Sequence, residues 1–264
     1  MLRFRLDNEV ELEKEITRHN PDRILSFTGR THSSEMNNVD YLEGPGKLVE
    51  NIRDNMYGPL VLALICKKLS IHLTYLGTGC LFNDDGKQTY NFVEEGQPNF
   101  FGSAYSTVKG FTDRVMHQFE DIVLNARIRM CLTETVHPRN FITKLTKYEY
   151  ICSLPNSMSV LPELLPILVD LSKRKVTGTV NLTNPGYITH NEILEMYKEI
   201  VEPDFTWKNF SMEEQDKVLA SKRSNNVLNT SKLESMYPDV LPIKPAVKKC
   251  LIKMKENKDG KVAK

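Results

Sequence analysis

Four side chains, Thr78, Cys80, Tyr105 and Lys109, occur in an order that could move a proton beside a hydride. An apolar run at residues 71–76 ends in a Gly-Thr-Gly-Cys turn that carries Thr78 and Cys80. Tyr105 follows Cys80 after twenty-five residues, and Lys109 lies one helical turn further on. A lysine ammonium beside a phenol favours the phenolate and lowers a pKa that is normally about 10. Tyr105 could then exchange a proton with a carbonyl oxygen, with the Thr78 hydroxyl as a second hydrogen-bond partner.

The Tyr-x-x-x-Lys spacing is weak by itself, and the order of the surrounding elements gives it weight. The chain has 10 tyrosines, so about one chance match is expected, and a tyrosine on an amphipathic helix more often belongs to a core. Here a strand delivers Thr78 at its carboxyl end, where α/β sheets bind ligands. A long loop and a helix with Tyr105 and Lys109 on one face follow. We therefore interpret these residues as a candidate catalytic set.

Composition and charge narrow the classes of protein. The chain has 264 residues, of which 40% are hydrophobic and 26% charged, as in a globular protein with a sizeable core. Its net charge of +1 argues against nucleic-acid binding. The start lacks the apolar core of a signal peptide, and the longest apolar run, residues 59–66, is too short to cross a bilayer. The five cysteines form no Cys-x-x-Cys pair, so we expect no metal site, no membrane contact and a reducing, cytoplasmic location.

Alternating strands and helices must position the candidate side chains. Gly58-Pro59 should kink a long helix near its middle. A loop of about two dozen residues, which contains Asp84, Asp85 and Gly86, should separate the Thr78 strand from the Tyr105 helix. In the first half we expect helices at 9–19, 47–69 and 103–119, and strands at 23–27, 71–76 and 122–130.

The second half continues the alternation and then becomes mainly helical. Thr189-x-x-Glu192 and Ser211-x-x-Glu214 have the form of capping boxes. We expect an α/β fold, with a Rossmann-like parallel sheet over residues 1–137 and a mainly substrate-binding, helix-rich lobe over 138–264. The strand at 178–184 should return to the main sheet. The expected elements are helices from Pro138 to about 148 and at 161–173, and strands at 151–154 and 178–183.

Seven short segments, spread over nearly the whole chain, form a pattern that is specific in combination. They are Gly-Thr-Gly-Cys-Leu-Phe (77–82), Pro-Asn-Phe-Phe-Gly-Ser (98–103), Pro-Arg-Asn-Phe-Ile-Thr-Lys (138–144), Pro-Asn-Ser-Met (155–158), Thr-Asn-Pro-Gly (183–186), His-Asn-Glu-Ile-Leu-Glu-Met-Tyr (190–197) and Arg-Ser-Asn-Asn (223–226).

With these segments the chain resembles the extended short-chain dehydrogenase/reductases, and among them the bifunctional UDP-4-keto-6-deoxyglucose 3,5-epimerase/4-reductases. The resemblance implies epimerisation at C3 and C5 of a UDP-sugar and reduction of its 4-keto group with NADPH, or with NADH, to give UDP-β-L-rhamnose. It also implies a homodimer. One departure is Cys131, which stands where the family is expected to have proline.

The resemblance assigns roles to individual residues. Cys80 and Lys144 would supply the acid and the base of epimerisation, Tyr105 would protonate the C4 oxygen, Lys109 would hold the nicotinamide ribose, and Thr78 would orient the keto group. From the residues alone, a cysteine just past a strand is more often a small buried hydrophobe, and a helical lysine is more often solvated.

Further candidates would hold the ligands. Arg223 suits a diphosphate because its fork matches phosphate oxygens, although a surface arginine is nearly as good an interpretation. Asn140 and Trp207 are weaker candidates for substrate contact. Gly29, Arg30 and Asn55 are candidates for lining the cofactor crevice.

The start of the sequence departs from the family. Members begin with a strand and a Gly-x-x-Gly-x-x-Gly turn that lets the backbone approach the cofactor pyrophosphate, and this sequence has no such motif. Three alternatives follow. The sequence is truncated relative to a working enzyme, which we favour because Thr78, Cys80, Tyr105, Lys109 and Lys144 are all present. Otherwise it keeps only the epimerase chemistry, or it is a non-catalytic, sugar-nucleotide-binding regulatory subunit.

Overall fold

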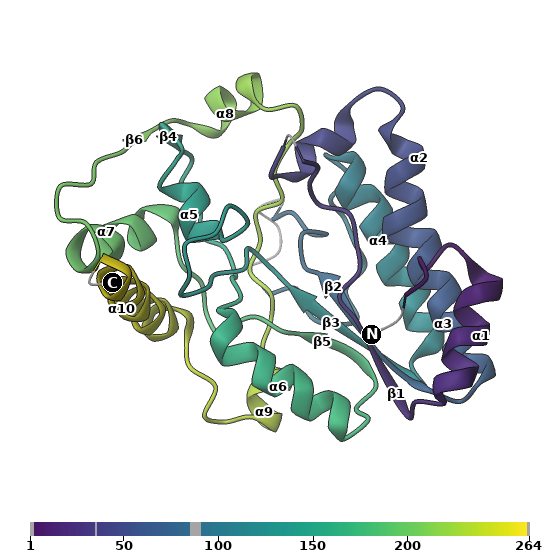
Figure 1. Cartoon of the computed structure of the whole chain (residues 1–264). Coiled ribbons are helices and arrows are strands. Elements are labelled where there is room, and N and C mark those ends of the chain that lie inside the picture. The colour runs from purple at the N-terminus through teal and green to yellow at the C-terminus, as the bar shows by residue number, and fades with distance from the viewer. Residues whose placement is uncertain (1–2, 35, 85–90, 263–264) are drawn as a thin grey trace.

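The protein folds around a parallel β-sheet (Figure 1), and the computed structural model describes residues 3–34, 36–84 and 91–262. Parallel sheets need cover on both faces, and the two central strands are buried along nearly their whole length. The predicted α/β fold with a parallel sheet is confirmed. Within the described residues the sheet has four strands, in the order β1 (Arg23–Ser26), β2 (His72–Thr78), β3 (Val123–Ile128) and β5 (Gly178–Asn181).

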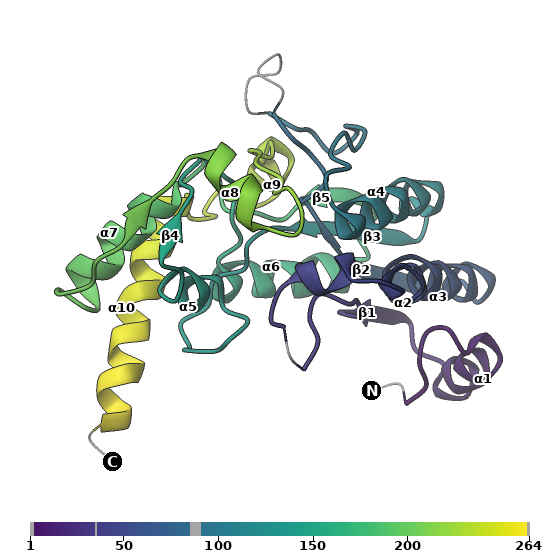
Figure 2. The same ribbon diagram turned by 90° about the horizontal axis from the view of Figure 1, so that it is seen from above.

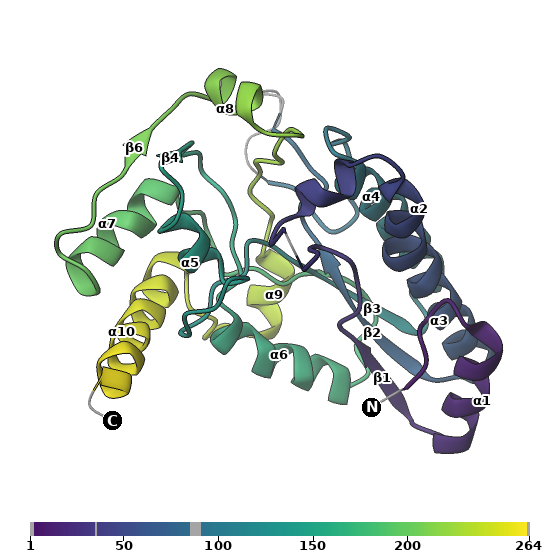
Figure 3. The same cartoon turned by 45° about the horizontal axis from the view of Figure 1, so that its top comes forward.

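Helices cover the two faces of this sheet (Figures 2 and 3). On one face Leu73 and Tyr75 of β2 pack against α1 (Glu9–His19), α3 (Gly58–Lys68) and the end of α4 (Ala104–Met116). On the other face Leu124 and Val180 pack against α6 (Leu161–Lys173) and α9 (Ser231–Met236). Both layers leave the carboxyl ends of the strands free for a site.

The long helix expected at 47–69 is present, but a π-helical turn interrupts it. It runs as α2 (Lys47–Ile52), a π turn (Arg53–Tyr57) and α3, with the Gly58 N–H bonded to the Arg53 carbonyl. Pro59 has no N–H to offer to the Asn55 carbonyl. The Thr112 hydroxyl of α4 donates to that carbonyl instead, at 2.8 Å. The predicted irregularity at Gly58-Pro59 therefore takes the form of a wider turn just before it.

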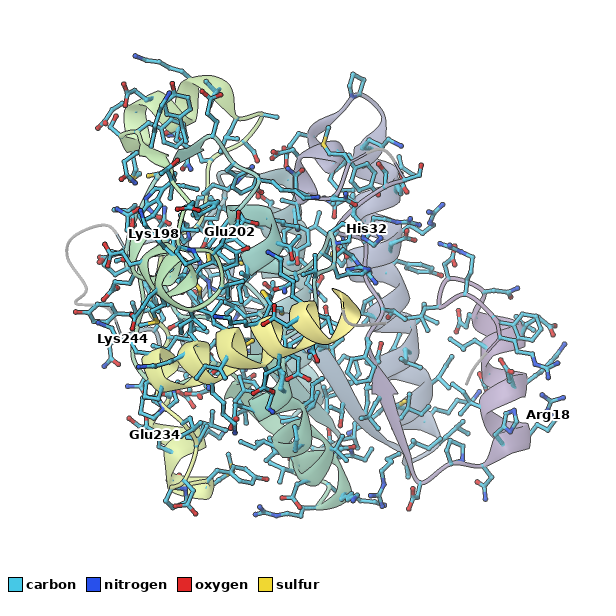
Figure 4. The ribbon with its side chains drawn as sticks, turned by 60° about the vertical axis from the view of Figure 1, so that its left-hand side comes forward. Arg18, His32, Lys198, Glu202, Glu234 and Lys244 are labelled. Atoms are coloured by element: carbon cyan, nitrogen blue, oxygen red, sulfur yellow. The ribbon has the colours of Figure 1, made fainter. Side chains whose placement is uncertain are left out.

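The remaining elements form a smaller lobe on the left of Figure 1. Its core includes Ile142, Ile188, Leu194 and Leu251. Both predicted capping boxes, at Thr189 and Ser211, are confirmed. Lys244, labelled in Figure 4, joins two of its helices by an ion pair with Glu192 at 2.5 Å. The elements are α5 (Phe141–Leu145), β4 (Tyr150–Ile151) paired with β6 (Lys208–Asn209), α7 (His190–Ile200), α8 (Met212–Val218) and α10 (Ile243–Val262).

Three sequence predictions need correction. The helix expected from Pro138 to about 148 is only α5, because the Asn140 side chain caps it by accepting from the Ile142 N–H at 3.2 Å. The strand expected at 151–154 is the two-residue β4. The helix expected at 103–119 ends as α4 at Met116 and continues as a 3₁₀ turn, His117–Phe119.

Two other observations concern the described part of the chain. Asp85 and Gly86, which we expected in the long loop, lie outside the residues that the structure describes. No described helix combines the length and the apolar character that a membrane span requires.

A buried ion pair joins helix α4 to the sheet. Asp113 of α4 and Arg127 of β3 are 3% and 0% exposed, and they form two hydrogen bonds of 2.8 and 2.7 Å. Burial alone would raise the pKa of Asp113, but hydrogen bonds from Arg127, His117 and Asn125 lower it to about 2. Arg127 also lies 5.2 Å from the centre of the Phe82 ring and donates to the Val93 carbonyl. The pair therefore ties α4, the sheet and the loop before α4 together.

We predict that Asp113→Asn destabilises the fold by about 3 kcal/mol or more, because it leaves the Arg127 guanidinium buried without a counter-charge. The pKa of Asp113 in the folded state, about 2, lies below its ordinary value of 3.8. The pair's contribution to stability is therefore complete above about pH 4 and is lost as the pH falls towards about 2. Urea unfolding of both proteins at several pH values would measure the difference.

The matched control is Asp121→Asn, because Asp121 also pairs with a cation, Lys67, but is 53% exposed. It should change the unfolding midpoint little. Equal stability of Asp113→Asn and the wild type at neutral pH would contradict the role of the buried pair.

Candidate active site

Thr78 and Tyr105 meet at the carboxyl end of β2. Thr78 is the last residue of that strand, and Tyr105 lies in the first turn of α4, where the Ser103 side chain caps the helix. The Tyr105 side chain is 9% exposed, and burial raises its pKa. The nearby Cys80 raises this pKa further, whereas a hydrogen bond with Thr78 opposes the shift. Tyr105 is therefore held as a neutral phenol, the form that can donate a proton.

The expectation that Lys109 lowers the pKa of Tyr105 is wrong for this structure. The Lys109 ammonium donates instead to the hydroxyl of Tyr75 on β2, and it lies 4.6 Å from the centre of the Tyr75 ring. Burial lowers the pKa of Lys109 to about 8, although Asp113 raises it. The sequence interpretation missed Tyr75, which is one of several polar side chains in a buried strand.

Cys80, Cys131 and Lys144 form a cluster beside Tyr105. Burial raises the pKa of Cys131 to about 12; Cys80 adds to this shift and Lys144 opposes it. Burial also lowers the pKa of Lys144, and Cys131 opposes that shift. The loop after β1 reaches the same region, because Lys144 is among the charges that lower the pKa of His32, after burial, Arg139 and Arg30. His32 is labelled in Figure 4. The structure therefore brings both residues predicted for epimerisation to one place.

A cavity of about 920 Å³ lies between the sheet and the smaller lobe. Cys80 and Tyr105 both line it, whereas Thr78, Lys109 and Lys144 are not among its lining residues. Several aromatic and cationic side chains complete the lining, among them Phe100, Tyr148, Tyr150, Phe210, Lys222 and Arg223. The size suits a nucleotide-linked sugar, since ligand pockets typically measure about 300–1,000 Å³.

Arg223 lines this cavity and is held by a carboxylate from the other half of the molecule. Its Nη1 and Nη2 donate to Asp40 Oδ1 and Oδ2 at 2.8 and 2.6 Å. Asp40 belongs to a 3₁₀ turn, Val39–Glu43, that follows β1 in the chain. Burial raises the pKa of Tyr148, Arg223 lowers it and Asp40 raises it, so the pair lies beside that ring. The bidentate pair fixes a planar cation at the cavity wall.

Two predicted substrate contacts are engaged elsewhere. The Asn140 amide donates to the Thr133 and Thr135 carbonyls, and its oxygen caps α5. Trp207 donates to Asn191 Oδ1 at 2.9 Å and packs against Phe205 in the smaller lobe. Neither residue lines the cavity, so the structure gives both a structural role.

The three residues predicted for the cofactor crevice lie together after β1. The Asn55 side chain accepts from the Arg30 N–H at 2.7 Å and donates to the Arg30 carbonyl at 2.9 Å. Arg30 forms an ion pair with Asp54 at 2.8 Å. Gly29 and Arg30 line a second hollow of about 890 Å³ that runs along β1.

Tyr105 beside Thr78 at the end of a parallel strand, with Lys109 one turn further along the same helix, is the arrangement of a reductase of the short-chain dehydrogenase/reductase class. More narrowly, the chain belongs to the family of bifunctional 3,5-epimerase/4-reductases that make nucleotide-linked rhamnose. It is 41% identical over 248 residues to the bifunctional dTDP-4-dehydrorhamnose 3,5-epimerase/dTDP-4-dehydrorhamnose reductase of Arabidopsis thaliana, covering 92% of this chain and 80% of that protein.

The relatives include a protein of solved structure. The chain is 53% identical over 254 residues to the uncharacterized protein L780 of Acanthamoeba polyphaga mimivirus, covering 95% of this chain and 88% of that one. The crystal structure of the L780 UDP-rhamnose synthase from the same virus matches with a TM-score of 0.93 at 51% identity, over 96% of this chain and 89% of that one.

Solved structures of low sequence identity share the fold of this chain. A dTDP-4-dehydrorhamnose reductase from Bacillus anthracis, in complex with NADP, matches with a TM-score of 0.76 at 14% identity, over 94% of this chain and 86% of that one, which shows a shared fold alone. No family model matches the chain.

We predict that Tyr75→Phe destabilises the protein by about 1–3 kcal/mol, because the buried Lys109 ammonium loses its acceptor. Chemical unfolding at neutral pH measures the change. Tyr57→Phe is the control, since the Tyr57 side chain is 44% exposed. If both variants were as stable as the wild type, the Lys109–Tyr75 contact would have no structural importance.

Proposed function

We propose that this chain epimerises UDP-4-keto-6-deoxyglucose at C3 and C5 and reduces its 4-keto group with NADPH to give UDP-β-L-rhamnose. The observation that carries the proposal is that Cys80 and Tyr105 share the wall of one cavity at the end of β2. Membership of the family supports the same reaction. One bound sugar could thus meet a base for its carbons and an acid for its carbonyl oxygen.

Epimerisation uses Cys80 and Lys144. The Cys80 thiolate takes the proton next to the C4 carbonyl, so that an S–H bond forms, a C–H bond breaks and the electron pair passes to the carbonyl oxygen. The Thr78 hydroxyl stabilises this enolate by a hydrogen bond. The Lys144 ammonium then returns a proton to the opposite face of the carbon.

Reduction uses Tyr105 and the residues behind it. NADPH, when bound, supplies the hydride that C4 receives. Tyr105 gives its proton to the C4 oxygen, with the Thr78 hydroxyl as its hydrogen-bond partner. The buried ammonium of Lys109 suits the nicotinamide ribose of such a cofactor. Gly29, Arg30 and Asn55 suit the cofactor crevice, since Gly29 and Arg30 line the hollow along β1 and Asn55 is bonded to Arg30. The resemblance to the family supports NADPH as the hydride donor, and NADH is the alternative donor.

The substrate's nucleotide would occupy the rest of the cavity. The Arg223 fork and the neighbouring Lys222 suit a diphosphate, and the rings of Tyr148, Tyr150 and Phe210 suit a base. Arg223 would exchange its bond with Asp40 for one with a phosphate.

Location and assembly are also proposals. The five cysteines are all free, as in a reducing compartment, which supports a cytoplasmic location. Leu64 of α3 and Phe111 of α4 are 49% and 58% exposed, and apolar side chains on these adjacent helices support a homodimer. Sedimentation should show a dimer that Leu64→Glu/Phe111→Glu converts to a folded monomer; a monomeric wild type would refute the dimer.

Proton exchange in heavy water tests the proposed function. Incubated with UDP-4-keto-6-deoxyglucose, the protein should introduce deuterium at C3 and C5, and added NADPH should then lose its absorbance faster than NADH. Tyr105→Phe should retain exchange but reduce the 4-keto group at least about 100-fold more slowly. Lys144→Ala should epimerise at least about 100-fold more slowly. It should still reduce a 4-keto-rhamnose nucleotide that has already been epimerised.

The outcomes separate the alternatives. Exchange without oxidation of either nicotinamide would leave an epimerase only. Binding of UDP without exchange would leave a non-catalytic subunit and would refute the catalytic proposal.

A further inference from the structure

Asn226 is a buried amide that bridges two carbonyls of the turn carrying Cys80. It is 0% exposed, and its Nδ2 donates to the Gly79 carbonyl at 3.0 Å and to the Phe82 carbonyl at 2.9 Å. The same nitrogen lies 2.9 Å from the Ser224 hydroxyl, whereas Oδ1 has no hydrogen-bond partner among the described residues. A buried polar atom without a partner is costly. What this asparagine contributes is therefore its nitrogen, which faces the turn.

The two bridged carbonyls lie on either side of the Cys80 side chain along the chain. Gly79 supplies the carbonyl of the peptide bond before Cys80, and Phe82 follows two residues after it. The Cys80 N–H donates to the Thr78 hydroxyl at 3.2 Å. The turn is thus held at its amide by the end of β2 and at its carbonyls by Asn226. The place at which Cys80 enters the cavity wall follows from these bonds.

The segment that contains Asn226 is itself fixed and packs closely on the turn. The Asn226 N–H donates to Asn156 Oδ1 at 3.1 Å, and the Asn226 carbonyl accepts from the Ser157 N–H at 3.0 Å. A Cβ added to Gly79 would lie 2.6 Å from Leu228 Cδ1, so the turn has no room to move towards the segment. The amide of Asn226 can therefore set the position of the turn.

The proton donor for reduction is held by other contacts. Tyr105 belongs to α4, which the bonds from Arg127 to Asp113 fix against the sheet. Among the described residues, Asn226 forms no hydrogen bond with α4. Loss of the Asn226 amide should thus displace Cys80 and leave Tyr105 in place.

We infer that Asn226 is a positioning residue that holds Cys80 where it can take the protons from C3 and C5. The inference rests on the proposed function and deepens it. Arg223, three residues earlier in the same segment, lines the cavity and is bonded to Asp40. One fixed segment thus carries a cation that suits the diphosphate and the amide that sets the position of the base.

Two rates measured on Asn226→Ala test the inference. Deuterium exchange at C3 and C5 should be at least about tenfold slower, because a small displacement of a reacting group has a large effect on rate. Reduction of an already epimerised 4-keto-rhamnose nucleotide with NADPH should stay within about twofold of the wild-type rate, since Tyr105 keeps its position. A purely structural role would instead slow both reactions in the same proportion, and that result would overturn the inference.

Asn181→Ala is the matched control. Asn181 is also 0% exposed, and its Nδ2 donates to the Phe92 and Asn229 carbonyls at 2.9 Å each, neither of which belongs to the Cys80 turn. This variant should lose stability as well but keep the wild-type ratio of exchange to reduction. An equal change of that ratio in both variants, or a folded Asn226→Ala with wild-type exchange, would contradict the positioning role.

Alkylation of Cys80 by iodoacetamide gives a reading without substrate. Followed by peptide mass spectrometry, the rate at Cys80 should rise several-fold in folded Asn226→Ala, because the released turn opens more often, and should not change in Asn181→Ala. An unchanged rate in folded Asn226→Ala would overturn the inference. If the wild type shows no deuterium exchange while the alkylation difference is present, the proposed function fails and the positioning of Cys80 stands.

A measurement on the wild type decides the question if Asn226→Ala does not fold. The side-chain amide protons of Asn226, followed by NMR of the labelled protein, should exchange slowly with solvent because the turn carbonyls hold them. Rapid exchange would show that the amide does not hold the turn and would refute the inference.

Discussion

The buried ion pair between Asp113 and Arg127 sets the position of everything that helix α4 contributes to the site. Tyr105, Lys109 and Asp113 are spaced four residues apart, so they share one face of the helix. The bidentate bond to Arg127 fixes one end of that face against β3, and the other two side chains lie against β2. Tyr105 then meets Thr78 and Lys109 meets Tyr75. A pairing that is structural in itself therefore determines which proton donor faces the cavity.

Three buried cations of the described residues, on α4 and at the end of β3, are outside the cavity lining, and each has a different partner. Arg127 has a carboxylate, Lys109 has a phenol, and Arg129 has backbone carbonyls and the Asn156 amide oxygen. Charge buried in this way acts at short range with little screening. The arrangement suits a reaction that passes through an enolate, since that anion would lie close to fixed positive charge. One cavity wall can thus serve proton removal and carbonyl protonation.

The sequence predicted the architecture well wherever local signals are strong. Apolar strands separated by amphipathic helices identified the parallel sheet, and the Thr189 and Ser211 capping boxes were found where their residue types indicated. The order of Thr78 and Tyr105 indicated their meeting, because a strand end and the next helix start are neighbours in such folds. The partner of Lys109 could not be predicted, because its flexible side chain could reach the hydroxyl of either Tyr75 or Tyr105. The Asp40–Arg223 pair joins positions 183 residues apart, and no spacing rule covers that distance.

The claim that one cavity performs both chemistries is tested most directly by the mass of a single product. The wild-type protein would convert UDP-4-keto-6-deoxyglucose in heavy water with unlabelled NADPH, and the product would be analysed by mass spectrometry and by NMR. The structure predicts UDP-β-L-rhamnose with deuterium on C3 and C5 and ordinary hydrogen on C4. A reduced sugar with ordinary hydrogen at C3 and C5 would show that Tyr105 acts without Cys80 and Lys144, and would contradict the shared site.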